Sequence, residues 1–77
     1  MTPSEAFGEI LKQARIERGV SQEKLALNCD LDRTFISLLE RGKRQPSLVS
    51  ILSLSASLKI PADELIKQTI DILEKNN

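Results

Sequence analysis

The feature that most constrains this chain is the regular recurrence of residues that start and stop helices. Four polar residues of the kind that caps helix N-termini are spaced along it: Ser4, Ser21, Asp32 and Ser47. Gly19 and Gly42 suit the position just after a helix, and Pro61 suits the start of one. These signals predict five helices, at about residues 4–18, 22–28, 33–41, 48–58 and 62–74.

Between these signals the apolar residues recur with helical spacing. Phe7, Leu11 and Ala14 lie four and then three residues apart, so they share one face of the first predicted helix. Ile36 and Leu39 are related in the same way in the third. No stretch alternates β-branched or aromatic residues with polar ones for long enough to form a strand. The chain is therefore predicted to be an all-α five-helix bundle, and its 77 residues predict one domain over residues 1–77.

The residue inventory excludes several functional classes. The chain has no His and a single cysteine, Cys29, so it lacks the ligands of a structural zinc site and a Ser-His or Cys-His nucleophile pair. No apolar run approaches the ~20 residues of a membrane span, and charges interrupt residues 1–20, where a signal peptide needs an apolar stretch. We therefore expect a cytoplasmic protein with no enzyme activity, metal or cofactor. No small-molecule ligand is expected, because there is no second domain to hold one.

The charges are unevenly distributed, although the net charge is zero. Residues 12–44 hold eight basic and five acidic residues, a balance of +3. The remaining residues hold three basic and six acidic ones, a balance of −3. A basic middle between acidic ends is compatible with binding to nucleic acid.

Two of the short predicted helices, joined by a turn at residues 29–31, are the ingredients of a helix-turn-helix over residues 21–42. The longer segment of residues 21–48 reads SQEKLALNCDLDRTFISLLERGKRQPSL. From about Phe7 to Ile66 the chain resembles the lambda-repressor/Cro-type helix-turn-helix family. The matching elements are Arg15, Ser21-Gln22, Leu25-Ala26, Leu31, Ile36, Glu40-Arg41-Gly42 and Pro46-Ser47-Leu48. The resemblance implies a lambda-repressor-like fold and a regulator of transcription that binds double-stranded DNA.

Within that family the run LDRTFIS followed by ERGKR looks most like the controller proteins of restriction–modification systems, which are single-domain dimers of about this length. A phage-type repressor and the antitoxin of a toxin–antitoxin pair are the alternatives. A protein-interaction module that uses the fold without DNA is a hypothesis from another class. The basic loop after residue 42, together with Gln22 and Arg33, favours DNA.

The third predicted helix carries the candidate base-reading residues. On a helical wheel Ile36, Leu39 and Glu40 face the body of the protein. The residues assigned to base contacts are Arg33, Thr34, Ser37 and Leu38. Arginine can pair with guanine, Ser and Thr with several bases, and Leu with a thymine methyl. Arg33 is the main candidate because it lies on the first turn, where the family's recognition helices enter the groove. The alternative is an ordinary solvated helix face.

Contacts to the DNA backbone are assigned to a second set: Ser21, Gln22, Phe35, Arg41, Lys43 and Arg44. Gln22 is the first residue of its predicted helix, where free N–H groups favour an anion, and the resemblance gives it a phosphate contact. Lys43 and Arg44 can neutralise phosphate charge. Gln22 could also be a simple surface residue, and the loop an ordinary basic one. For Phe35, the resemblance suggests a ring against the sugar–phosphate wall, and the wheel equally allows a half-buried core aromatic.

Three further positions are interpreted structurally. The resemblance pairs Arg15 with Glu40 as a partly buried ion pair that fixes the recognition helix, against the alternative of two unrelated surface charges. Asp30 and Lys59 stand where the family often has Gly, and position 30 commonly needs a positive φ. Cys29 occupies a position that is usually apolar and inward, which favours a small buried hydrophobe over a redox sensor.

The sequence also predicts a surface for self-association. The outer positions of the fourth helix include Val49 and Ala56, and the last helix, within residues 61–75, is apolar over a wide arc. The residues assigned to a homodimer interface are Val49, Ala56, Leu65, Ile66, Ile70 and Leu73. A two-fold dimer would place two recognition helices on a palindromic operator. The alternative is that the last helix folds back fully onto the chain's own core.

Overall fold

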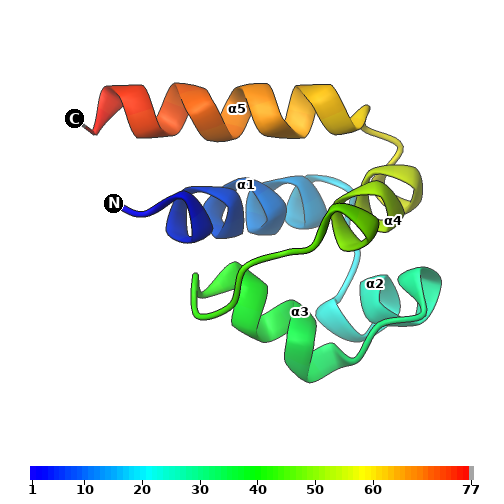
Figure 1. Cartoon of the computed structure of the whole chain (residues 1–77). Coiled ribbons are helices and arrows are strands. Elements are labelled where there is room, and N and C mark those ends of the chain that lie inside the picture. Colours follow the sequence, from blue (N-terminus) through cyan, green and yellow to red (C-terminus); the bar gives the residue numbers. More distant parts are fainter. Residues whose placement is uncertain (77) are drawn as a thin grey trace.

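The computed structural model describes residues 1–76, and these fold into five helices with no strand. The helices are α1 (Pro3–Glu17), α2 (Gln22–Cys29), α3 (Arg33–Glu40), α4 (Leu48–Leu58) and α5 (Ala62–Lys75). The all-α prediction is confirmed. Figure 1 shows α5 running alongside α1, with the short α2 and α3 below them and α4 closing one end.

The start of α1 differs from the prediction. Thr2, not Ser4, is the N-cap, because Pro3 occupies the first helical position, where its missing N–H is not needed. The Thr2 hydroxyl accepts a hydrogen bond from the Glu5 backbone N–H (3.1 Å), and the Glu5 carboxylate accepts one from the Thr2 N–H (2.8 Å). The hydrogen bond from the Thr2 backbone N–H to the carboxylate lowers the pKa of the Glu5 carboxyl. The prediction of Ser4 as the cap is wrong.

The next three helix starts follow the prediction. Ser21 and Ser47 each accept a hydrogen bond from a backbone N–H three residues later, at 3.0 Å in both cases. Asp32 accepts one from the backbone N–H of Thr34 at 2.8 Å. The last helix begins after Pro61 with no side-chain cap. The two helices of the helix-turn-helix therefore both start at side-chain caps that the sequence identifies.

Helices α1 to α4 all end at a residue with positive φ: Gly19 (67°), Asp30 (55°), Gly42 (70°) and Lys59 (57°). The left-handed backbone expected at Asp30 is confirmed, and Lys59 adopts it as well. This conformation costs a residue with a Cβ roughly 1–2 kcal/mol, and Asp tolerates it better than Lys does. Lys59 is therefore the most strained of the four helix ends.

Replacing Lys59 with glycine is expected to stabilise the fold by about 1 kcal/mol, because glycine adopts the left-handed backbone without strain. For a domain of this size that corresponds to a rise of roughly 4–8 °C in the unfolding temperature. Thermal unfolding followed by circular dichroism measures it. The matched control is Lys12→Gly, an exposed position inside α1, which is expected to destabilise by about 1 kcal/mol. A loss of stability in both variants would contradict the strain argument.

The core draws on all five helices. Its fully buried large side chains are Leu11, Leu25, Ile36, Leu39, Leu54, Leu58 and Leu65. Leu65, which the sequence assigns to a dimer interface, packs in this core; that assignment is wrong because the side chain has no exposed surface to offer a second chain.

Gly8 brings α1 and α3 unusually close together. A Cβ at Gly8 would collide with the carbonyl oxygens of Leu39 and Glu40, at the last turn of α3. Only glycine permits this approach of the two backbones. The C-terminal end of α3 is therefore seated directly on α1, which restricts the angle at which α3 leaves the body of the protein.

Candidate nucleic-acid interface

Helix α3 turns one edge toward solvent and the opposite edge into the core. Arg33 and Thr34 on its first turn are exposed, while Ile36 and Leu39 are fully buried. Glu40 is buried as well. The other residues predicted to face outward differ in exposure: Arg41 is exposed, whereas Ser37 and Leu38 are half-buried. The structure therefore brings Arg33, Thr34 and Arg41 together with the partly accessible Ser37 and Leu38 along one helix face.

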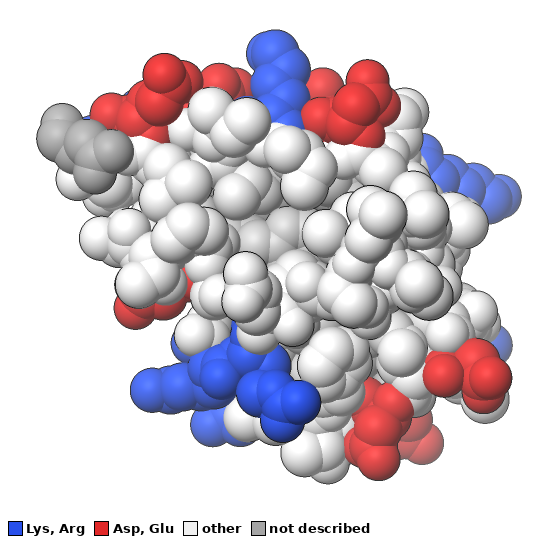
Figure 2. All heavy atoms as spheres, in the orientation of Figure 1, with Lys and Arg blue, Asp and Glu red and all other residues white. Residues whose placement is uncertain are grey.

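Basic side chains lie at the C-terminal end of this face. Arg41, Lys43 and Arg44 are all exposed at the end of α3 and in the loop that follows. Figure 2 shows Lys and Arg gathered over this part of the molecule, below a face that carries little charge. Within residues 1–76, the ion pairs are Arg15–Glu40 and Lys67–Asp71, so these cations have no carboxylate within 4.0 Å. Their charge is available to an external anion.

Arg15 and Glu40 form the ion pair that the sequence predicts. The Arg15 Nε and Nη2 groups donate to the two carboxylate oxygens of Glu40 at 2.5 and 3.1 Å. Arg15 Nη1 donates to the Val20 carbonyl oxygen at 2.8 Å. The side chains are 13% and 2% exposed, respectively. A bidentate pair with this little exposure ties α1 to the last turn of α3.

Gln22 joins the same network, which sequence reasoning did not identify. Its side-chain Nε2 donates to Glu40 Oε1 at 3.0 Å, and the residue is half-buried. Since a carboxylate can only accept, this contact also fixes the orientation of the amide. Gln22 keeps one further amide hydrogen for another acceptor. The simple surface alternative does not hold, because the side chain bridges the start of α2 and the end of α3.

Phe35 lies partly in the core and partly under a cation. It is half-buried and packs against the core cluster, as the core alternative requires. The Cζ atom of Arg44 lies 6.0 Å from the centroid of its ring. The sequence contains no spacing signal for this pair, because it depends on the path of the loop after α3.

Another region of the molecular surface is apolar and exposed. Its most exposed large side chains are Leu48 (71%), Val49 (73%), Leu52 (53%) and Ile70 (48%), with Ile66 beside them. Ala56 is also exposed and Leu73 half-buried. Figure 2 shows that the middle of this face is free of charge, with acidic and basic side chains along its upper edge. The sequence did not single out Leu48 and Leu52, since apolar residues lie all around α4 and only packing decides which turn inward.

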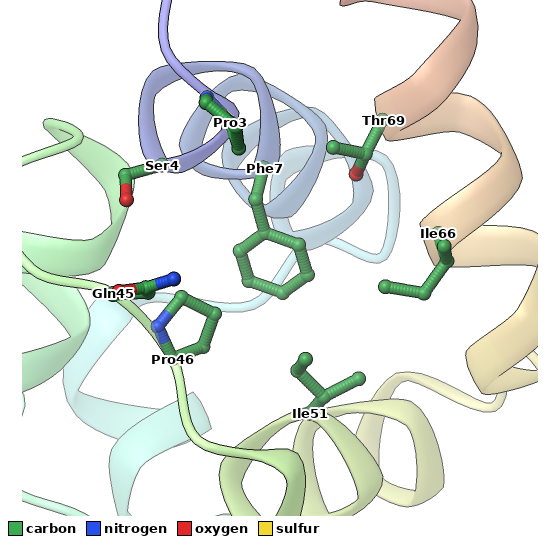
Figure 3. Close-up of a pocket in the computed structure, with 8 residues that line it drawn as sticks. All are labelled: Pro3, Ser4, Phe7, Gln45, Pro46, Ile51, Ile66 and Thr69. Carbon is green, nitrogen blue, oxygen red and sulfur yellow. The ribbon is translucent and has the colours of Figure 1, made fainter.

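An open hollow lies within this apolar face. It has a volume of about 210 Å³ and lies where α1, α4, α5 and the loop before α4 meet. Figure 3 shows the side chains of its wall: Pro3, Ser4, Phe7, Gln45, Pro46, Ile51, Ile66 and Thr69. The wall of the hollow is mainly apolar. The exposed apolar face therefore contains a concave site as well as protruding hydrophobic side chains.

Cys29 behaves as a small hydrophobe. It is half-buried against the core, and its Sγ donates to the Ser53 carbonyl oxygen at 3.5 Å. Burial raises the pKa of this thiol. A raised pKa lowers the thiolate fraction, which is the reactive form, so the structure favours the packing interpretation over a redox sensor.

Within residues 1–76, no helix is long and apolar enough to cross a membrane. No group of three or more Cys, Asp or Glu side chains in the same part of the chain could hold a metal ion.

Comparison with known proteins places this geometry in context. The helix-turn-helix family matches residues 11–65. Control protein C.BamHI of Bacillus amyloliquefaciens is 44% identical over 64 residues, which cover 82% of this chain and 79% of that protein. Control protein C.MunI of Mycoplasma sp is 48% identical over 60 residues, covering 77% and 81%. The crystal structure of the restriction-modification controller protein C.AhdI from Aeromonas hydrophila superposes with a TM-score of 0.79 at 44% identity, covering 80% of this chain and 94% of that one.

Proposed function

Since the chain belongs to the Cro/C1-type helix-turn-helix family of DNA-binding transcriptional regulators, we propose that it is the controller protein of a restriction–modification system. It acts in the cytoplasm, as a homodimer on a palindromic operator. The relatives that support this role over a phage repressor or an antitoxin are the controller proteins, which match most of the chain.

The observation that carries the proposal is the first turn of α3. Arg33 and Thr34 are exposed there, and the opposite end of the helix is held by Gly8 and the Arg15–Glu40–Gln22 network. A rigidly held helix with a free guanidinium at its tip suits entry into a major groove, where arginine can donate to both guanine acceptors. The exposed cations of the following loop suit the flanking phosphates.

The dimer is proposed from the apolar face. In a monomer this face exposes a large apolar patch to water, which is unfavourable. Its residues are Leu48, Val49 and Leu52 on α4 and Ile66 and Ile70 on α5. A second copy of the same surface would cover it through a two-fold axis. Two recognition helices would then read half-sites about one DNA turn apart, roughly 34–36 Å.

Replacing Arg33 with alanine tests base reading. The operator is first recovered by enrichment from a library of random duplexes. We expect Arg33→Ala to cost about 1–3 kcal/mol of binding free energy on this operator and much less on random DNA. Fluorescence anisotropy on both duplexes measures the two losses.

The matched control for that experiment is Lys67→Ala, which removes a cation from the exposed side of α5. We expect it to leave the affinities for the operator and for random DNA unchanged within experimental error. Equal losses from Arg33→Ala on operator and random duplexes would show that Arg33 contacts only phosphate. No binding of the unaltered protein to any duplex would overturn the proposed function.

A further inference from the structure

Phe35 is the third residue of α3, and its ring lies between the core and a loop cation. The ring packs against the core cluster, and the Arg44 guanidinium carbon is 6.0 Å from its centroid. This separation is at the outer limit of a cation–π contact. The chain has no Trp or Tyr, so Phe35 is one of its two aromatic residues, the other being Phe7.

The backbone after α3 explains how Arg44 reaches the ring. Gly42 adopts a φ of 70°, and its N–H donates to the Leu39 carbonyl oxygen at 3.1 Å. The N–H of Lys43 donates to the Leu38 carbonyl oxygen at 2.9 Å. These two bonds close the helix end and turn the chain back along α3. The loop therefore brings Arg44 to the first half of the recognition helix instead of leaving it at the far end.

Arg44 has no competing partner in the part of the chain that the structure describes. It forms none of the ion pairs there and donates none of the side-chain hydrogen bonds. A guanidinium held over a ring keeps its N–H groups free, because they all lie in its plane and point outward. The ring can thus restrict the long side chain while leaving every donor available to a phosphate oxygen.

We propose that Phe35 is a positioning residue that holds the Arg44 guanidinium ready for a phosphate of the DNA backbone. The ring acts through Arg44 and does not itself contact the DNA. This inference rests on the proposed function, since it assigns a role within the same DNA interface.

A double-mutant cycle on the operator duplex tests the inference. Phe35→Leu keeps an apolar side chain for the core but removes the ring. It is expected to weaken binding about 2–5-fold in the unaltered protein, the range of an exposed cation–π contact. In an Arg44→Ala background the same substitution is expected to cause no further loss. Phe35→Tyr keeps the ring and is expected to retain the original affinity.

Lys43→Ala supplies the matched background. Lys43 is the neighbouring exposed cation, and no ring lies beneath it. Phe35→Leu should therefore weaken binding by the same factor in this background as in the unaltered protein. A loss that is equally large in the Arg44→Ala background would overturn the inference, because the ring would then act on DNA directly.

A second measurement does not depend on whether any variant folds. Protons held over the face of an aromatic ring resonate upfield, so the Arg44 side-chain protons of the free protein are expected to be shifted in that direction. Unshifted Arg44 resonances would overturn the positioning role. Failure of the unaltered protein to bind the operator would instead overturn the proposed function, so the two failures are distinguishable.

Discussion

Replacing Ile70 with glutamate is expected to convert the proposed dimer to monomers and to abolish tight operator binding. Ile70 is 48% exposed in the single chain, so the substitution removes little from the monomer core. At a two-fold interface one substitution introduces two like charges, and desolvating them costs several kcal/mol, of the order that a buried unpaired charge costs. Each monomer keeps its fold but offers one recognition helix, which contacts only half of the operator.

Sedimentation at micromolar concentration measures this change, with circular dichroism to show that the helices remain. The control is Lys67→Glu, which places a glutamate one turn away at a side chain that is 72% exposed. That variant is expected to stay dimeric. If Ile70→Glu also stays dimeric, the interface excludes α5 at this point, and the exposed residues Val49 and Leu52 of α4 become the next positions to alter.

Replacing Arg15 with methionine is expected to cost about 3–5 kcal/mol of the free energy of unfolding, because it leaves the Glu40 carboxylate without its charged partner. The Glu40 side chain is 2% exposed, so water cannot take the place of the guanidinium. Only the amide of Gln22 would still donate to it. The Val20 carbonyl oxygen would also lose the hydrogen bond from Arg15 Nη1. Urea denaturation measures the loss.

Arg18→Met is the matched control for that loss. Arg18 lies at the end of the same helix and is exposed, with one long hydrogen bond of 3.4 Å to the Lys59 carbonyl oxygen. Its replacement is expected to change stability by less than about 0.5 kcal/mol, as is usual for surface positions. A second comparison adds Glu40→Leu to Arg15→Met, which removes the stranded charge and is expected to recover part of the loss. Equal stabilities for Arg15→Met and Arg18→Met would contradict the role given to the ion pair.

The helices could be predicted from the sequence because their limits depend on local chemistry. Ser21, Asp32 and Ser47 cap helices through bonds to nearby backbone N–H groups, and such bonds need no tertiary contact. Thr2 could not be distinguished from Ser4 by composition alone, and the deciding factor is the fit of Pro3 to the first helical position.

Which residues are exposed could be predicted from the sequence only in helices with a single apolar face. The wheel correctly separates Arg33 and Thr34 from the buried Ile36 and Leu39. It could not predict that Leu65 faces inward while Leu52 faces outward, because both helices carry apolar residues on several sides. The bond from Gln22 to Glu40 joins residues 18 positions apart and depends on how the helices pack. The placement of Arg44 over Phe35 depends on the path of the loop after α3.

The affinity for the operator duplex as a function of salt tests the central claim, DNA binding by a localised basic face, most directly. The net charge of the chain is zero, so its overall charge gives no reason for strong salt dependence. If the exposed cations of α3 and its loop contact phosphates, the logarithm of the affinity falls linearly with the logarithm of the salt concentration. The slope is expected to be about −0.9 for each phosphate contacted. An affinity that does not change with salt, or no binding even at low salt, would contradict the account.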